Sequence, residues 1–403
     1  MLEIFIAIIL GLLAGTLTGL APGIHINLIS SFLVGSIGLF AGVDTISLVV
    51  FIVSMSITHT FLDFIPSIYL GAPEEDSFLS VLPGHKMLKQ GLAHEAFVLT
   101  LYGSITALPI ILILTPVFVF GLPLVFSFLK TSIPFILIFA SIYLVLREEK
   151  PLVALIVFLL SGFLGFFTFS LPVEQPLLPL LTGLFGLSSL LISLKQKPKI
   201  EKQVITRLKE IKLRKSEFIK TSFAAFVAAP LCSFLPGIGS GHAAVLGSEI
   251  SNQSEQNPRS FLFLVGAINT IVMSLSFVTA YSIEKTRTGS AAAVQQLLEK
   301  ISPSDLIVIL ITIMLTGVIV FFLGVYLSKL SSRYINKINY TKLTITIIII
   351  LVIFNMIFTN WVGLIVLLVG SAVGVYCILS SSRRINMMGS LIFPTILYYL
   401  IVN

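Results

Sequence analysis

Long uncharged apolar runs are the sequence feature that most restricts how this chain can fold. Residues 152–169 and 343–358, for example, contain no Asp, Glu, Lys or Arg. A helix needs about 20 such residues to cross roughly 30 Å of hydrocarbon. Hydrophobic residues make up 56% of the 403 residues and charged residues only 11%, too few to cover a soluble domain. The sequence therefore predicts an all-α polytopic membrane protein, and disfavours a soluble enzyme, a nucleic-acid-binding domain and an outer-membrane barrel.

Apolar segments recur along the whole chain, and several are too short to cross a bilayer alone. They are residues 2–20, 27–43, 46–71, 97–128, 131–146, 151–170, 176–194, 218–248, 259–283, 304–328, 343–359, 361–379 and 388–402. The segments around Pro22 and Pro236 are interrupted, so we expect broken or re-entrant helices there. We predict about ten to twelve membrane passes in total. The first segment lacks a basic start and a cleavage site, which favours a retained helix over a signal peptide.

Basic residues are concentrated in the loop 195–220. It contains ten Lys or Arg and three Asp or Glu, a net charge equal to the +7 of the whole chain. Such loops beside membrane spans remain cytoplasmic, so we place this one on the cytoplasmic side of a prokaryotic inner membrane. Basic clusters at 329–342 and 383–384 can share that side, because the two crossings 343–359 and 361–379 separate them. We expect the basic loop to be solvated and to face lipid headgroups, with no nucleic acid as partner.

A weak internal repeat relates the two sides of this loop. Gly19–Asn27 reads GLAPGIHIN and Phe234–His242 reads FLPGIGSGH, with their prolines 214 residues apart. Further on, Thr58-His59-Thr60 is followed after 210 residues by Ile268-Asn269-Thr270. Related halves joined by a linker are typical of secondary transporters, whose halves are often inverted in the membrane. We therefore predict an N-terminal half (1–194), a cytoplasmic linker (195–220) and a C-terminal half (221–403); coincidence is the alternative.

The two proline–glycine breaks are the candidate substrate site. Proline removes a helical hydrogen bond and glycine loosens the backbone, and lipid cannot satisfy the amides thus left unpaired. A helix that restarts after a break points its first amides at the cavity, which favours an anion. The candidate residues are Pro22, Gly23, His25, Asn27, Pro236, Gly237, Gly239, Ser240, Gly241 and His242. The alternative is a pair of kinks that serve only packing.

Polar residues inside the apolar segments are the next candidates, because such groups are costly at membrane depth. His59 and Asp63 are four residues apart, on one helical face, and either carry a proton for ion coupling or form a structural pair. Thr58, Thr60, Asn269 and Thr270 are expected to line the same cavity, although membrane threonines often bond their own backbone.

The polar segment 71–95 is expected to be a hydrated loop, with His85 and His94 solvated. No metal-binding HExxH pattern occurs, and nothing in the sequence places a nucleophile beside a base. The sequence therefore does not indicate an enzyme, and no cofactor is expected beyond Na⁺ or H⁺ as coupling ion.

The segment LPGHKMLKQGLAHEA (82–96), with the two breaks, resembles the large membrane subunit, TctA, of tripartite tricarboxylate transporters. That family has a loop of the type D-G-x-x-M-x-x-x-G-x-A-x-x-A. Here Gly84, Met87, Gly91, Ala93 and Ala96 match it, and Pro83 replaces the acidic residue. The chain is shorter than typical members and looks like a divergent branch. The resemblance implies ion-driven uptake of organic anions, with a small membrane subunit and an extracytoplasmic binding protein as partners.

The leading hypothesis is a secondary transporter of a di- or tricarboxylate-like anion, coupled to an ion gradient, with alternating access between two repeats. A transporter of a lipid-linked phosphate, such as polyprenyl phosphate, would use the same anion-binding breaks and is the first alternative. An intramembrane enzyme is the second, and would require His25, His59 and His242 to converge.

Overall fold

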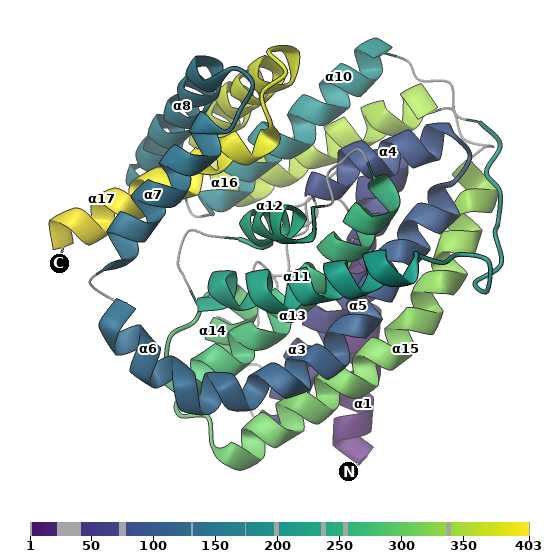
Figure 1. Ribbon diagram of the computed structural model, residues 1–403, viewed down its shortest axis with the longest axis vertical. Helices are drawn as coiled ribbons and strands as arrows, with labels where there is room; N and C mark the ends of the chain where they lie inside the picture. Colours follow the sequence, from purple (N-terminus) through teal and green to yellow (C-terminus); the bar gives the residue numbers. More distant parts are fainter. Residues whose placement is uncertain are drawn as a thin grey trace.

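The computed structural model describes residues 2–21, 42–71, 78–129, 132–173, 175–196, 201–234, 239–252, 257–335 and 340–402. Throughout these ranges the regular structure is helical (Figure 1). Nine helices of the described part are long and apolar enough to cross a membrane, and the helices at 134–146 and 177–192 are apolar but shorter. The predicted all-α polytopic membrane protein is confirmed, and the number of passes remains a prediction.

The helices form two groups. The core bundle consists of α1 (Leu2–Leu20), α3 (Thr45–Leu62), α4 (Val81–Lys89), α5 (Ala93–Pro116), α11 (Lys215–Phe234), α12 (Ser240–Ser251), α13 (Pro258–Ile283), α14 (Gly289–Leu298) and α15 (Pro303–Ile335). The peripheral bundle consists of α7 (Ile133–Leu146), α8 (Pro151–Ser170), α9 (Leu177–Leu181), α10 (Ser188–Gln196), α16 (Tyr340–Leu379) and α17 (Gly389–Val402). A π-helical turn and α6 (Leu122–Leu129) follow α5 and pack on α13. Each bundle takes helices from both predicted halves, so the fold interleaves the halves.

Helices α1 and α3 are parallel and very close. A Cβ atom on Gly11 would lie 2.7 Å from the Ser54 Cβ, and one on Gly15 would lie 2.5 Å from the Thr58 Cβ. Small residues spaced by four allow membrane helices to approach closely, because little attraction other than packing and hydrogen bonding joins them in lipid. The glycines of α1 therefore allow α3 to pack directly against the α1 backbone.

Helices α11 and α13 form the corresponding parallel pair in the C-terminal half. The rings of Phe218 and Phe263 lie 5.4 Å apart near the starts of both helices. The Asn257 amide also donates to the Glu217 carboxylate at 3.2 Å, at the same end. Helices α11 and α13 thus begin at the same end of the bundle and run in the same direction, as α1 and α3 do.

The two pairs run in opposite directions. Tyr69, just after α3, and His94, at the start of α5, both contact the Ser328 side chain. Glu95, beside His94, pairs with Arg259 at the start of α13 at 2.8 Å. The α3 segment therefore ends at the end of the core bundle where α13 begins. These directions agree with the predicted inverted halves, whose boundaries remain a prediction.

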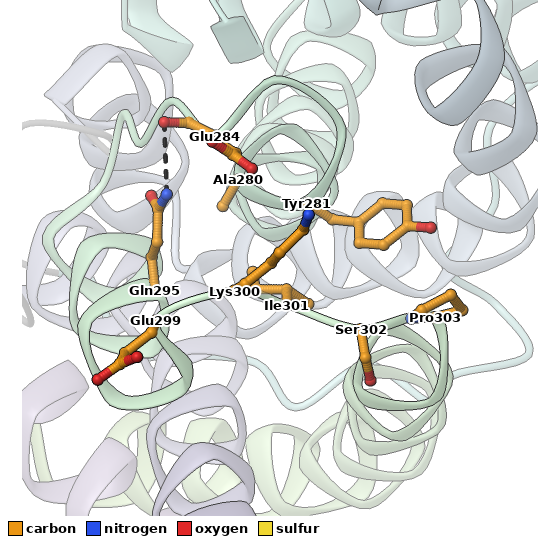
Figure 2. Close-up of a pocket in the computed structure, with 9 residues that line it drawn as sticks. All are labelled: Ala280, Tyr281, Glu284, Gln295, Glu299, Lys300, Ile301, Ser302 and Pro303. Carbon is orange, nitrogen blue, oxygen red and sulfur yellow. Dashed lines mark hydrogen bonds between the residues drawn. The ribbon is translucent and has the colours of Figure 1, made fainter.

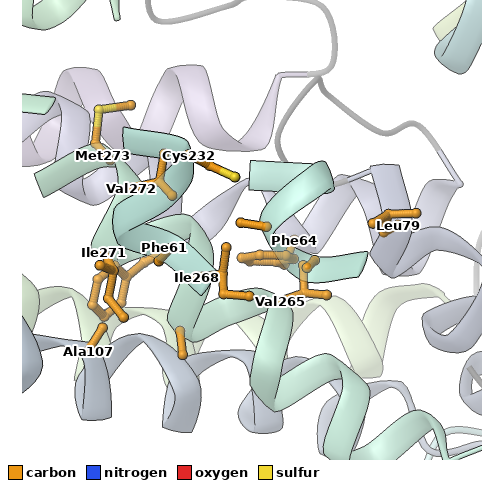
Figure 3. Packing of buried hydrophobic residues seen from close by; sticks show 14 of the residues in the cluster. Phe61, Phe64, Leu79, Ala107, Cys232, Val265, Ile268, Ile271, Val272 and Met273 are labelled. Atoms are coloured by element: carbon orange, nitrogen blue, oxygen red, sulfur yellow. The ribbon is translucent and has the colours of Figure 1, made fainter. Parts of the chain in front are cut away.

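Apolar packing holds the centre of the core bundle. Phe61, Ile268 and Cys232 come from α3, α13 and α11 and lie in one buried cluster (Figure 3). Helix α5 joins this cluster through two glycines: a Cβ on Gly103 would lie 2.0 Å from the Phe263 carbonyl oxygen, and one on Gly266 would lie 2.2 Å from the Thr100 carbonyl oxygen. Only residues without a side chain allow the backbones to approach this closely.

The predicted interruptions are found where the structure describes them. Gly239 is extended and α12 begins at Ser240, so the chain is not helical directly before α12, while the predicted break at Pro236 itself lies outside the described residues. Helix α16 is kinked at Asn360 (φ 58°, ψ −170°), where the sequence predicts the split between 343–359 and 361–379. Helix α1 ends at Leu20, and the first break itself lies outside the described residues.

The expected hydrated loop at 71–95 is wrong for its described part, whereas most residues of the described linker, 201–220, are exposed as expected. Residues Val81–Lys89 form α4, and His94 is fully buried. The linker packs against this region: the Val204 amide donates to the Gly91 carbonyl at 2.8 Å, and the Gln203 side chain accepts from the Ala93 amide at 3.0 Å. The linker thus satisfies backbone groups at the start of α5, which no intrahelical bond can satisfy.

Candidate functional site

Helices α3 and α13 are the spans that protein covers most completely. In their most apolar windows 89% and 100% of residues are buried, against 28–39% in the other candidate spans. Charged and amide side chains at this depth need protein partners because lipid offers none. The seam between α3 and α13 is therefore the place where the described polar candidates can meet.

Asp63 and Asn269 join the two halves across this seam. The Asn269 amide nitrogen donates to Asp63 Oδ2 at 3.2 Å and lies 3.4 Å from the Thr60 carbonyl oxygen. Asp63 and Asn269 are each 1% exposed. A side chain of the predicted C-terminal half thus contacts the backbone of α3 and the side chain of its C-cap residue in the N-terminal half.

His59 links α3 to α1. Its Nδ1 lies 3.1 Å from the Thr18 hydroxyl oxygen, and both side chains are buried. The backbone amide of Asp63 donates to the His59 carbonyl, so the two predicted coupling residues occupy successive turns. A buried imidazole and a buried carboxylate one turn apart can exchange or share a proton.

The predicted threonines already have acceptors within their own helices. Thr58 Oγ1 donates to the Ser54 carbonyl at 2.8 Å, and Thr270 Oγ1 donates to the Gly266 carbonyl at 3.1 Å. Thr60 bonds carbonyls of its own preceding turn in the same way. Only the lone pairs of these hydroxyls remain for a ligand, so the threonines are weaker candidates than Asn269 or Asp63.

The first turn of α12 contains a buried histidine, His242, whose Nε2 can donate a hydrogen bond. Gly239 is extended (φ −94°, ψ 179°) and its amide donates to His242 Nδ1 at 3.2 Å. A neutral imidazole that accepts at Nδ1 carries its proton at Nε2. His242 Nε2 is buried and has no hydrogen-bond partner among the described residues. Ser240 and Gly241, also predicted, form the first buried residues of α12.

The remaining predicted substrate residues lie outside the described part of the chain. They are Pro22, Gly23, His25, Asn27, Pro236 and Gly237. Their assignment to the site stays a prediction.

A second buried polar cluster was not predicted. The Tyr69 hydroxyl lies 2.7 Å from the Ser332 hydroxyl oxygen and 3.0 Å from that of Ser328, which also contacts His94 Nδ1 at 2.9 Å. Ser328 and Ser332 are four residues apart in an apolar helix. This spacing puts two hydroxyls on one helical face and could have indicated the cluster.

A hollow of ≈ 390 Å³ opens where α13 ends and α15 begins (Figure 2). Its lining includes the carboxylates of Glu284 and Glu299 and the ammonium of Lys300. Gln295 donates to the Glu284 carbonyl at 3.4 Å on one side of it. Two negative groups against one positive group make this hollow a poor binding site for an anion.

The fold and the buried polar seam define a polytopic helical membrane protein with polar groups enclosed between its spans. The Tripartite tricarboxylate transporter TctA family matches residues 5–389, so the chain belongs to that family. The chain is 33% identical to Uncharacterized protein MJ1079 of Methanocaldococcus jannaschii over 405 residues, which covers 98% of each protein. No solved structure matches it.

Proposed function

We propose that this protein is a secondary transporter of an organic anion of the di- or tricarboxylate type. The observation that carries the proposal is the start of α12, where the His242 Nε2 donor is buried and has no hydrogen-bond partner among the described residues. A helix N-terminus carries a partial positive charge and unpaired amides, which together favour an anionic group.

Asp63 and His59 are the proposed coupling residues. The Asp63 carboxylate lies in the seam between the halves, where its negative charge favours Na⁺ or H⁺. Alternating access requires the two halves to move against each other, which would lengthen the Asn269–Asp63 contact. An ion bound at Asp63 in one state and released in the other would couple its gradient to substrate movement.

The proposed setting is a prokaryotic cytoplasmic membrane with the loop 195–220 inside. Lys209 and Arg214 in the described part of the linker, with Lys329 at the same end of the core bundle, give this end its positive charge. Family membership supports a small membrane subunit and an extracytoplasmic binding protein as partners.

Counterflow into proteoliposomes tests the proposal. Vesicles loaded with unlabelled citrate or succinate should accumulate the labelled compound, and an imposed Na⁺ or H⁺ gradient should accelerate net uptake. Protein-free vesicles are the control. No uptake of either anion under either gradient would overturn the proposal. Movement of a labelled polyprenyl phosphate between leaflets, without carboxylate uptake, would instead support the lipid-linked alternative.

A further inference from the structure

The segment after α13 folds back into the core bundle. Glu284 adopts a left-handed conformation (φ 52°) directly after the last residue of α13. Four residues later, the Thr288 hydroxyl oxygen lies 2.9 Å from that of Ser276, which precedes the end of α13 by seven residues. At 1.5 Å per residue, Thr288 therefore lies about 10 Å inward along the helix axis. The segment 284–288 is thus re-entrant.

Helix α14 starts at this depth and is held there by protein. The Thr288 side chain caps it by accepting from the Ala291 amide at 3.2 Å. Ser290 and Ala291 are fully buried, and α14 packs against both α3 and α13. The tip of the re-entrant segment is therefore a fixed part of the core bundle.

Arg287 is the charged residue at this tip. It is partly buried and precedes Thr288, which contacts Ser276 of α13, and α13 packs against both α11 and α12. This places its positive charge near the Cys232 thiol and the His242 imidazole. Cys232 lies near the end of α11 and His242 near the start of α12, so these residues flank the predicted break around Pro236 on both sides. An arginine that is partly buried among apolar helices needs protein groups, water or a ligand around its charge, which makes it a candidate ligand-binding residue.

We propose that Arg287, the His242 Nε2 donor and the first amides of α12 together bind one carboxylate of the substrate. This proposal rests on the proposed function and deepens it by naming the group that selects for charge. The start of α12 offers neutral donors only, and a guanidinium adds a fixed positive charge and two parallel N–H donors that match a carboxylate. Arg287 was not among the residues predicted from the sequence.

The direct test measures binding of labelled citrate and succinate to the purified full-length protein in nanodiscs. Arg287→Gln should weaken binding of both anions at least tenfold, and Arg287→Lys, which keeps the charge, should weaken it less. Lys285→Gln is the matched control, because Lys285 is exposed, lies two residues away and loses the same charge. It should leave binding within twofold of the unmodified protein.

Two substitutions at His242 keep the test decisive if Arg287 variants do not fold. An Asn side chain can still accept from the Gly239 amide but has no group at the Nε2 position, whereas Gln places its amide nitrogen near that position. His242→Asn should lose binding tenfold or more, and His242→Gln should retain more of it. Equal binding by the two His242 variants and the unmodified protein would overturn the proposal.

The possible failures are distinguishable. If the unmodified protein binds citrate or succinate and a folded Arg287→Gln variant binds within twofold of it, the Arg287 site is wrong and the proposed function stands. If the unmodified protein neither binds nor transports any carboxylate, the proposed function is wrong and the Arg287 site fails with it. A melting temperature within about 2 °C of the unmodified protein defines a folded variant here.

Discussion

Two regions of the molecule have similarly apolar sequences but differ in burial and in polar side chains. They are the seam between α3 and α13 and the surface of the peripheral bundle. The windows of α3 and α13 are 89% and 100% buried, whereas that of α8 is only 33% buried. Asp63 and Asn269 meet in the seam and His59 lies one turn before Asp63, whereas α8 contains no charged residue. Asp63 and Asn269 lie where protein replaces lipid around them, so burial distinguishes the polar seam from the exposed apolar surface of the peripheral bundle.

The two regions nevertheless pack by the same rule. In the peripheral bundle, a Cβ on Gly165 would lie 1.9 Å from the Ser390 carbonyl oxygen, and one on Gly374 would lie 2.3 Å from the Leu184 carbonyl oxygen. In the core bundle, Gly266 approaches Thr100 equally closely. Close glycine packing therefore belongs to the fold as a whole, and the polar seam is what differs.

The strongest test of this comparison is the charge in the seam. Asp63→Asn keeps the size of the side chain and removes its charge, so ion-coupled uptake of citrate should fall at least 100-fold in proteoliposomes, a loss of roughly 2.7 kcal/mol. Asp44→Asn is the control, since Asn can also cap a helix start and Asp44 caps α3 at its exposed end. Uptake by the Asp63→Asn variant within threefold of the unmodified rate would show that this carboxylate does not couple.

Alanine at the close-packed glycines should destabilise both bundles alike. Gly266→Ala and Gly165→Ala force a methyl group against a backbone oxygen, and such overpacking costs about 1–3 kcal/mol or more. The control is Gly121→Ala, because a Cβ there would meet no atom within 4 Å. Melting temperatures in detergent measure the effect. A clear loss in the core bundle with none in the peripheral bundle would show that the two regions do not share a packing rule.

The fold was predictable wherever the signal was local. Residues 2–20 were predicted as one helix and form α1, and Asn360 interrupts an apolar run where it was expected to do so. The break before Ser240 followed from the proline and glycines next to it. Hydropathy and helix breakers act over a few residues, so the sequence carries this information directly.

The segment 71–95, which we expected to be a hydrated loop, is buried in part through contacts between residues far apart in the sequence. Gln203 bonds the amide of Ala93, 110 residues earlier, and the approach requires the positive φ of Gly91 (78°). A Cβ on Gly91 would lie 2.7 Å from the Lys202 carbonyl oxygen. Gly91 and Ala93 belong to the family-like motif, which identified the family but gave no sign that its residues pack against the linker. Polarity alone suggested a hydrated loop.

The sequence was sufficient to predict the polar residues of the seam, but not the proposed role of Arg287. Asp63 and Asn269 were both chosen from the sequence because polar groups in apolar segments are rare, and the structure brings them together. Arg287 lies in a polar stretch after α13 that resembles any surface loop. Only the contact between Thr288 and Ser276 shows that this segment folds back along α13.

The pH dependence of stability tests the environment of His85, where the core bundle meets the peripheral bundle. Burial, with smaller contributions from Lys89 of α4 and from Arg384 beside the peripheral bundle, lowers the pKa of the His85 imidazole from 6.5 to about 4. The neutral form is therefore the one that the folded state prefers. Its contribution to stability is complete above pH 6.5 and is lost as the pH falls toward 4, by about 1–3 kcal/mol.

Melting temperatures between pH 7.5 and pH 4.5 measure this effect, with His85→Gln as the comparison. The variant should lose less stability on acidification than the unmodified protein, because it has no imidazole to protonate. Parallel pH profiles for the two proteins would contradict the assignment of this acid sensitivity to His85.

The smallest predicted effect concerns the linker. Gln203→Ala removes the bonds from the Ala93 amide and to the Leu88 carbonyl, which should lower stability by about 1–2 kcal/mol. Trypsin should cut at Lys209 or Arg214 several times faster, because a loosened linker offers its backbone more often. Lys202→Ala is the control, as that side chain is exposed. Citrate uptake should change less than twofold, since the Gln203 side chain bonds groups of α4 and of the start of α5. Loss of uptake without faster proteolysis would place the linker within the transporting part and redraw the boundary between the two regions.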